Sequence, residues 1–201
     1  DVFITPYYFK AIIDISKKIP NFGTIRGVSN FVDNGSKLHN IDIKNKIKNI
    51  DQINEFSKKI YEDKGVSFFE EKFLTGDVFF VNRKSLEDIG YFDNFFYGYF
   101  SDHDFGIRLR KAGYKLLVAK GAFAYHQQHS NFKYLDKINR KNKLNTRWAR
   151  VFENWARFKI KYSLPADLMY AGINYIPWNK LSEKSKEKKF IRKIDYSKFL
   201  L

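Results

Sequence analysis

The stretch Phe100–Tyr114, FSDHDFGIRLRKAGY, combines a helical pattern with a high density of charged side chains. Apolar residues recur at helical spacing over 102–112, and Gly113 stands where a glycine in the left-handed conformation often ends a helix. Asp102 and Asp104 open the stretch, and helix N-termini favour carboxylates because backbone N–H groups and the helix dipole are directed at them. The pattern therefore predicts a helix with an acidic start.

The two aspartates have different expected roles. Asp104 lies four residues before Arg108, the spacing of an ion pair on a helix, which favours a structural role. Asp102 either caps the helix or projects a carboxylate from the loop–helix junction into a cleft, where it can take a proton from a bound hydroxyl. The residues alone leave both roles open and favour capping. His103 is expected on the surface rather than as a ligand.

Strands and helices alternate on both sides of this stretch, which predicts an α/β layer fold. Helices are expected at residues 6–19, 50–61 and 83–90, where apolar residues recur at helical spacing, and Pro6 suits a first helical turn. A longer helix is expected from about 135 to 162, followed by a basic amphipathic segment. Strands are expected at residues 1–5, 23–31, 66–74, 76–82 and 114–126.

Composition narrows the class of protein. Of the 201 residues, 44% are hydrophobic and 18% aromatic, which is enough for a domain with a core. The absence of cysteine excludes disulfides and thiolate metal sites. No apolar run reaches the roughly 18 residues of a membrane span. The first residues show no basic region before an apolar one, so no signal peptide is expected.

Positive charge is concentrated at the end of the chain. The net charge is +15, and residues 140–201 hold 16 Lys and Arg against 5 Asp and Glu, a net of +11. Such a segment attracts phosphates, although a solvated lysine-rich surface is equally expected. With Trp148, Trp155 and Trp178 interleaved, one alternative is a nucleic-acid- or anionic-polymer-binding module without catalysis. The helical spacing of Trp148 and Trp155 argues instead for core positions.

Two other motifs are individually weak. Thr75, Gly76 and Asp77 begin TGDVFFVNR, in which a glycine at a strand start marks either close approach to a ligand or an ordinary bulge. His126 and His129 lie in AYHQQHS after a strand, where a histidine is either a metal ligand with oxygen partners or simply hydrogen-bonded in a loop. A metal-dependent phosphohydrolase is a further alternative, but it would need more closely clustered Asp and His residues than this sequence contains.

In their order along the chain, these motifs resemble one family. From Phe73 to about Ser130 the chain is similar to the second half of a family 2 glycosyltransferase domain with the GT-A fold. The shared order is Thr-Gly before an apolar strand, Arg with a short helix, Gly-aromatic-Phe-Asp, an aromatic loop, an acidic motif, a helix, a strand and a His. Residues 1–35 resemble the stretch that begins at the last Asp of the family's DxD motif. The resemblance covers residues 1–132 and implies a partial GT-A-like mixed sheet with flanking helices, followed over 133–201 by a helical, basic C-terminal extension.

The resemblance implies a reaction and three residues for it. Asp102 matches the catalytic base, and Asp1 and His126 match ligands of a divalent metal, Mn²⁺ or Mg²⁺, on the sugar-nucleotide diphosphate. Inverting transfer needs a base for the acceptor hydroxyl and neutralisation of the departing diphosphate. The implied enzyme moves a sugar from a nucleotide-diphosphate donor to a surface glycan or a protein glycan. The bias to Lys, Ile and Asn suggests a bacterial source.

The resemblance also implies a substrate pocket. Thr75, Gly76 and Asp77 lie where the family lines the acceptor and donor-sugar pocket, and Asp104 belongs to the same acidic motif as the base. Two positions depart from the family pattern. Ser101 replaces the Glu that usually precedes the base, and Asp77 replaces a small residue, which makes the pocket more acidic.

The partners and location are expectations of the same kind. The family holds the nucleotide in a βαβ half before the DxD motif, so we expect the isolated chain to have little or no transferase activity. The missing strands would leave an uncovered sheet edge open to self-association. The expected partners are a nucleotide-sugar, a glycan or glycoprotein acceptor and an anionic membrane surface at the basic tail. No specific nucleic acid is expected, and the expected location is cytoplasmic and peripheral at the inner membrane face.

Overall fold

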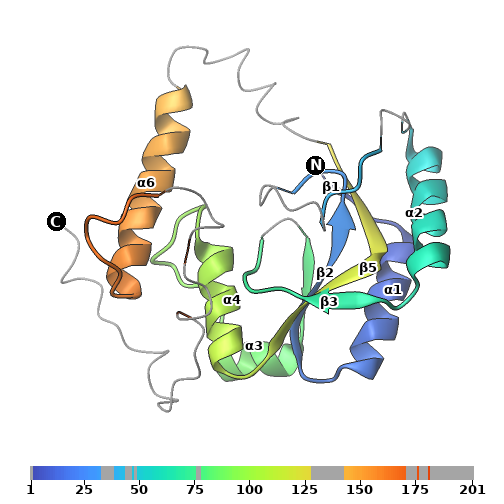
Figure 1. Cartoon of the computed structure of the whole chain (residues 1–201), viewed down its shortest axis with the longest axis horizontal. Coiled ribbons are helices and arrows are strands. Elements are labelled where there is room, and N and C mark those ends of the chain that lie inside the picture. Colours follow the sequence, from blue (N-terminus) through green and yellow to red (C-terminus); the bar gives the residue numbers. More distant parts are fainter. Residues whose placement is uncertain are drawn as a thin grey trace.

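The fold is a mixed sheet of five strands flanked by helices, which confirms the predicted α/β class (Figure 1). The computed structural model describes residues 2–32, 39–43, 47, 49–75, 78–127, 143–170, 176 and 181. In chain order the elements are β1 (Val2–Phe3), α1 (Pro6–Lys18), β2 (Phe22–Ser29), α2 (Ile50–Lys64), β3 (Phe68–Glu70), β4 (Phe79–Val81), α3 (Arg83–Ile89), α4 (Ser101–Lys111), β5 (Lys115–His126) and α6 (Lys143–Lys161).

The long strand β5 organises the sheet. It pairs in parallel with β2, and it pairs antiparallel with β1 and with β3. The strand order is β1-β5-β2-β4, so that β4, antiparallel to β2, forms one edge within the described part of the chain. Most side chains of β2 and β5 are buried, as expected for strands that are covered on both faces.

Polar caps explain where the helices begin. Thr5 precedes Pro6 and caps α1, because its Oγ1 accepts a hydrogen bond from the Tyr8 N–H at 3.4 Å. The Oδ1 of Asn49 caps α2 by accepting from the Gln52 N–H at 3.0 Å. The glycine predicted to end α3, Gly90, has φ 81. These local signals place the helices within a few residues of their predicted positions.

Each face of the sheet has its own core. On one face, α1 buries Ile12 and Ile15 against Ile25 and Leu117. On the other face, α4 packs around Leu116 with α3 beside it. The described part of the chain contains no helix that is both long enough and apolar enough to cross a membrane.

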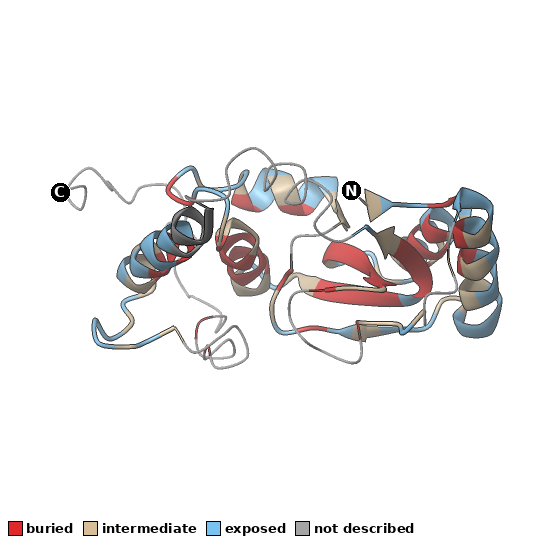
Figure 2. Cartoon of the chain, turned by 90° about the horizontal axis from the view of Figure 1, so that it is seen from above, coloured by how far each residue is buried: buried red, intermediate tan, exposed pale blue. Residues whose placement is uncertain are grey.

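The helix α6 shares a core with α4 and with the loop over 91–100 (Figure 1, Figure 2). Trp155 and Phe158 of α6 pack in one cluster with Phe100 and with Ile107 of α4. Trp155 is 5% exposed, which confirms its predicted core position. The segment between β5 and α6 and most of the basic tail lie outside the described residues. The division of the chain at residue 132 stays a prediction.

Candidate active site

The N-terminal end of α4 lies on the same side of the sheet as the carboxyl ends of β2 and β5 (Figure 1). In open α/β sheets, ligands bind beyond the carboxyl ends of the strands. Three predicted site residues belong to this side: Asp102 in the first turn of α4, His126 at the end of β5, and Thr75 in the connection that leads into β4. The topology therefore gathers segments that are distant in sequence at one side of the molecule.

Asp102 lies in the first turn of α4 but does not cap it. The helix begins at Ser101, one residue earlier than predicted, and its N-cap residue is Phe100, which makes no side-chain capping bond. Phe100 has φ 67, a left-handed conformation that is uncommon and costly for a residue other than glycine. The Asp102 side chain is 21% exposed, and its Oδ1 accepts a hydrogen bond from the His103 N–H at 2.9 Å. Asp102 is therefore not the N-cap residue, but its carboxylate still accepts a backbone N–H of the first turn, and it is partly accessible.

His103 is buried, so its predicted surface position is wrong. Its Nδ1 lies 2.6 Å from the backbone oxygen of Leu74, and its ring meets those of Phe73 and Phe100 edge-on. The prediction failed because the segment Phe73–Leu74 and the ring of Phe100 cover His103. The contact fixes the start of α4 to the residue before Thr75.

A glycine allows α4 to approach this segment closely. A Cβ at Gly106 would lie 2.9 Å from the Leu74 Cβ and 3.1 Å from the Leu74 backbone nitrogen. Such distances are too short for a side chain without movement of the backbone. Gly106 and His103 together therefore set the position of Leu74 and Thr75 relative to the start of α4.

Asp104 forms the predicted ion pair and is completely buried. Its Oδ2 accepts from Arg108 Nε at 2.8 Å, while its Oδ1 accepts from the Tyr162 hydroxyl at 2.7 Å and lies 2.5 Å from Lys161 Nζ. Burial lowers the pKa of Lys111 on the same helix, and on that pKa Asp104 and Lys161 act in opposite directions. These contacts favour a structural role for Asp104. Its role as a substrate-binding residue stays a prediction.

His126 lies beside the start of the described chain. It pairs with Val2 in the β1–β5 ladder, and the Asn30 side chain accepts from its backbone N–H at 2.6 Å and donates to its backbone oxygen at 3.0 Å. Its Nδ1 lies 3.3 Å from the Phe31 backbone oxygen. The other predicted ligand, Asp1, lies outside the described residues. Within the described ranges, three or more ligating side chains do not gather at any place, and the implied metal site stays a prediction.

Thr75 sits next to a buried arginine that no sequence motif had indicated. Arg26 of β2 is completely buried, and its Nη1 donates to the Thr75 backbone oxygen at 3.4 Å. The Thr75 hydroxyl is buried, and no described group hydrogen-bonds to it, which is a costly arrangement for a polar group. The indication that the sequence offered was Arg26 itself, the single charged residue in the strand-like run GTIRGVSNF. Gly76 and Asp77 lie outside the described residues.

A buried His–Glu pair on the β3 side of the sheet was also not predicted. His39 Nε2 lies 3.0 Å from Glu71 Oε2, and both residues are less than 9% exposed. The pair joins the segment after β2 to the residue after β3. No motif in the sequence links these two residues, because they come together only when β3 pairs with β5.

Side chains of α6 hold the aromatic loop that leads into α4. Asn154, 1% exposed, accepts from the Tyr97 backbone N–H at 2.8 Å and donates to the Tyr97 backbone oxygen at 3.0 Å. Arg157 donates to the Phe95 backbone oxygen at 2.7 Å, and Lys161 lies 2.6 Å from Asp93. These three polar residues lie on one stripe of α6. Their spacing is visible in the sequence, but the loop that the stripe contacts is not.

Replacing Asn154 with Ala is expected to lower the free energy of unfolding by about 1–3 kcal/mol, because both backbone groups of Tyr97 lose their partner. Hydrogen exchange at the loop amides should accelerate more than exchange in β2 or β5. The control is Asn49→Ala, which removes an asparagine that also bonds to a backbone N–H, but at the exposed start of α2. Equal acceleration at the loop in both variants would contradict a role of Asn154 in holding the loop.

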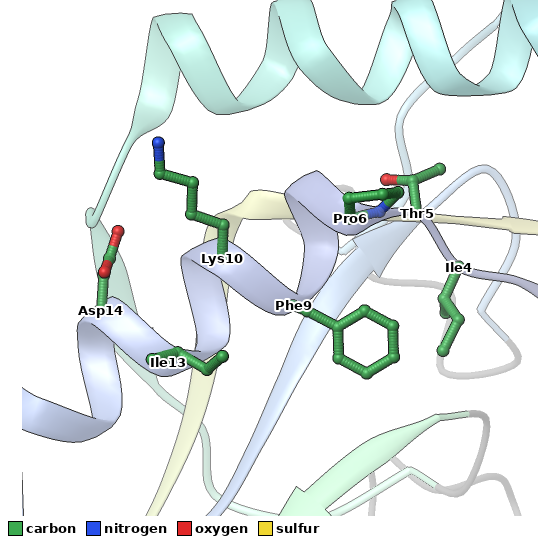
Figure 3. Close-up of a pocket in the computed structure, with 7 residues that line it drawn as sticks. All are labelled: Ile4, Thr5, Pro6, Phe9, Lys10, Ile13 and Asp14. Atoms are coloured by element: carbon green, nitrogen blue, oxygen red, sulfur yellow. The ribbon is translucent and has the colours of Figure 1, made fainter.

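A surface groove lies elsewhere, on the outer side of α1 (Figure 3). It contains none of the predicted site residues. Phe9 and Ile13 project from α1 on this surface and are 39% and 48% exposed. The residues that line the groove are Ile4, Thr5, Pro6, Phe9, Lys10, Ile13 and Asp14.

Comparisons of the chain with models of protein families, with curated proteins and with solved structures gave no match. Its function is therefore inferred from the residues and from their arrangement.

Proposed function

We propose that this chain carries the acceptor side of a glycosyltransferase site and that Asp102 is the general base of an inverting sugar transfer. The observation that supports this most is the position of Asp102. Its partly exposed carboxylate lies in the first turn of α4, and its neighbour His103 contacts the residue before Thr75. A base needs this combination of access to substrate and rigid support.

The proposed step is a single displacement. The acceptor hydroxyl oxygen forms a bond to the anomeric carbon of the donor sugar while its proton passes to the Asp102 carboxylate. The bond from the anomeric carbon to the diphosphate oxygen breaks, and its electron pair leaves with the nucleoside diphosphate. The buried contacts of Phe100 and His103 hold the backbone on both sides of this junction. Asp1 and His126 remain the predicted ligands for a divalent ion on the diphosphate.

The resemblance to family 2 glycosyltransferases also implies the donor and the acceptor. The donor is a nucleotide-diphosphate sugar and the acceptor a bacterial surface glycan or a protein glycan. The alternative of a nucleic-acid-binding module loses one of its supports, because Trp155 is buried in the core and cannot stack on a base.

The proposal predicts where a donor analogue lies. Mn²⁺ with excess UDP broadens NMR signals near its binding site even when affinity is low. We expect broadening at the amides of Val2 and His126 and at the start of α4, because the base must face the sugar on the same diphosphate. His126→Ala should remove the broadening, whereas Asp102→Asn should keep it, since a base is not a ligand.

The control uses another helix start. Asp51 is an exposed aspartate in the first turn of α2, so Asp51→Asn removes the same kind of charge away from the proposed site. Its broadening pattern should match that of the unchanged protein. Broadening confined to exposed carboxylates of α2, with none at His126, would refute the metal and donor assignment. Broadening at His126 without any at the start of α4 would show that Asp102 does not lie near the bound donor, which would contradict its role as the base.

A further inference from the structure

The strand β4 forms an open edge of the sheet within the described part of the chain. It pairs with β2 on one side, and no described strand pairs with it on the other side. Its three residues, Phe79, Phe80 and Val81, are all apolar. Proteins usually protect such an edge with charged residues or proline, because an open edge can pair with another chain. The strand β4 contains neither.

The direction of the backbone groups of β4 follows from its ladder with β2. The Asn82 N–H donates to the Gly23 oxygen at 2.9 Å, so Asn82 turns its backbone groups toward β2. In an antiparallel ladder this direction alternates from one residue to the next. Phe80 therefore also faces β2, whereas the backbone N–H and C=O groups of Phe79 and Val81 point to the side on which no described strand lies.

An exposed apolar face of α1 lies beside this edge. The ring of Phe9 meets the ring of Phe80 edge-on, with 5.5 Å between the ring centroids. Phe9 is 39% exposed and Ile13 is 48% exposed. Figure 3 shows both side chains pointing away from α2, toward which Lys10 points. The groove on α1 and the edge of β4 therefore belong to one surface. This surface, called here the β4 surface, consists of Ile4, Phe9, Ile13 and Phe79–Val81.

The charged residues next to the β4 surface are engaged elsewhere. The groove contains two of them, Lys10 and Asp14, and both contact Tyr61 of α2. The Lys10 ammonium lies 4.9 Å from the centroid of the Tyr61 ring, and Asp14 accepts from the Tyr61 hydroxyl at 3.0 Å. A strongly charged partner would find no counterpart in this groove, whereas a second copy of the chain presents the same apolar surface without opposing charges.

We propose that two copies of the chain associate through the β4 surface, with the two β4 strands antiparallel about a two-fold axis at Phe80. Phe79 of each copy then lies opposite Val81 of the other, and their outward backbone groups form hydrogen bonds that continue the sheet. An identical strand is sufficient for this pairing, because Phe79 and Val81 lie symmetrically about Phe80. Phe9 and Ile13 of both copies come to lie on the same face of the joined sheet.

Other kinds of partner match the β4 surface less well. A membrane would cover the apolar side chains but would leave the backbone groups of the edge unpaired. A nucleic acid would do neither. The proposed association rests on the sheet edge and on the apolar face, and it does not depend on the proposed transferase activity.

The test is the molar mass of the full chain, measured by sedimentation equilibrium over the micromolar concentration range. We expect a reversible equilibrium between monomer and dimer. Val81→Pro removes an N–H that points toward the second copy, while the hydrogen bonds between β4 and β2 stay in place. Because the two-fold axis repeats this loss, the dissociation constant of the dimer should rise at least about tenfold.

Phe68→Pro on β3 is the matched control, because β3 also lies at an edge of the described sheet. The Ser67 oxygen and the Glu71 N–H bond to β5, so by alternation the Phe68 N–H points away from β5. This variant should form the dimer as the unchanged chain does. Circular dichroism of both proline variants shows whether each is folded.

A cysteine at the proposed two-fold axis tests the register of the two strands directly. The chain has no cysteine, so Phe80→Cys introduces a single thiol. Because its backbone groups face β2, residue 80 would form a non-hydrogen-bonded pair with its counterpart in the second copy. The Cα atoms of such a pair are about 4.5 Å apart, which is within the range that a disulfide spans. Mild oxidation should therefore give covalent dimers of Phe80→Cys but not of Phe68→Cys.

Two results would overturn the proposal. A chain that stays monomeric over this concentration range would show that the edge of β4 does not pair with a second copy. A dimer that Val81→Pro weakens no more than Phe68→Pro does would place the contact elsewhere, and so would covalent dimers of Phe68→Cys in the absence of those of Phe80→Cys.

Discussion

Replacing Asp104 with Ala should lower the free energy of unfolding by about 3–5 kcal/mol, the cost of breaking a buried ion pair by removing one partner. The Asp104 carboxylate is 0% exposed and contacts Arg108 and Lys161. Without it, two cations stay in a poorly solvated region with part of their compensation gone. The Tyr162 hydroxyl also loses its acceptor. Urea unfolding followed by circular dichroism measures the change.

A second ion pair in the chain provides the comparison. Arg83 and Glu87 have the same i,i+4 spacing at 3.0 Å, but their side chains are 91% and 63% exposed. Glu87→Ala should therefore cost no more than about 0.5 kcal/mol, as exposed pairs on helices do. Similar costs for Glu87→Ala and Asp104→Ala would contradict the view that burial, rather than spacing, gives the Asp104 pair its importance.

The sequence predicted those parts of the fold that depend on neighbouring residues. Pro6 marked the start of α1, Gly90 the end of α3, and Gly113, with φ 90, the end of α4. The Asp104–Arg108 pair was also predictable, because both partners lie on adjacent turns of the same helix. In each case the helix end or the ion pair follows from the residue type and from its spacing to neighbouring residues.

The sequence did not predict contacts that depend on which elements meet. His103 was expected on the surface because its own helix gives no sign that Phe73 and Leu74, which are distant in sequence, cover it. Asn154 and Tyr97 are 57 residues apart, and the stripe of α6 that holds the loop reads as an ordinary polar face. Asp102 is not the N-cap residue, because the backbone at Phe100, held by the same core, starts the helix one residue earlier; its carboxylate bonds to the His103 N–H within the first turn instead.

Replacing Phe158 with Ala tests whether α6 and α4 form one structural unit. Phe158 is 0% exposed, and its ring lies 5.2 Å from that of Phe100, 4.6 Å from that of Tyr162 and 5.8 Å from that of Trp155. Removing a buried phenyl ring typically costs about 3–5 kcal/mol, because a cavity remains where the ring packed. We expect a loss in this range from urea unfolding.

Hydrogen exchange separates two ways in which this loss can arise. If α6 and α4 unfold together, the amides of both helices should lose protection by the same amount. Phe152→Ala, on the exposed face of the same helix, should leave both unchanged within about 0.5 kcal/mol. Loss of protection confined to α6 would contradict a shared core and favour the predicted division at residue 132. A shared loss would mean that α6 supports Phe100, and through it the start of the helix on which Asp102 lies.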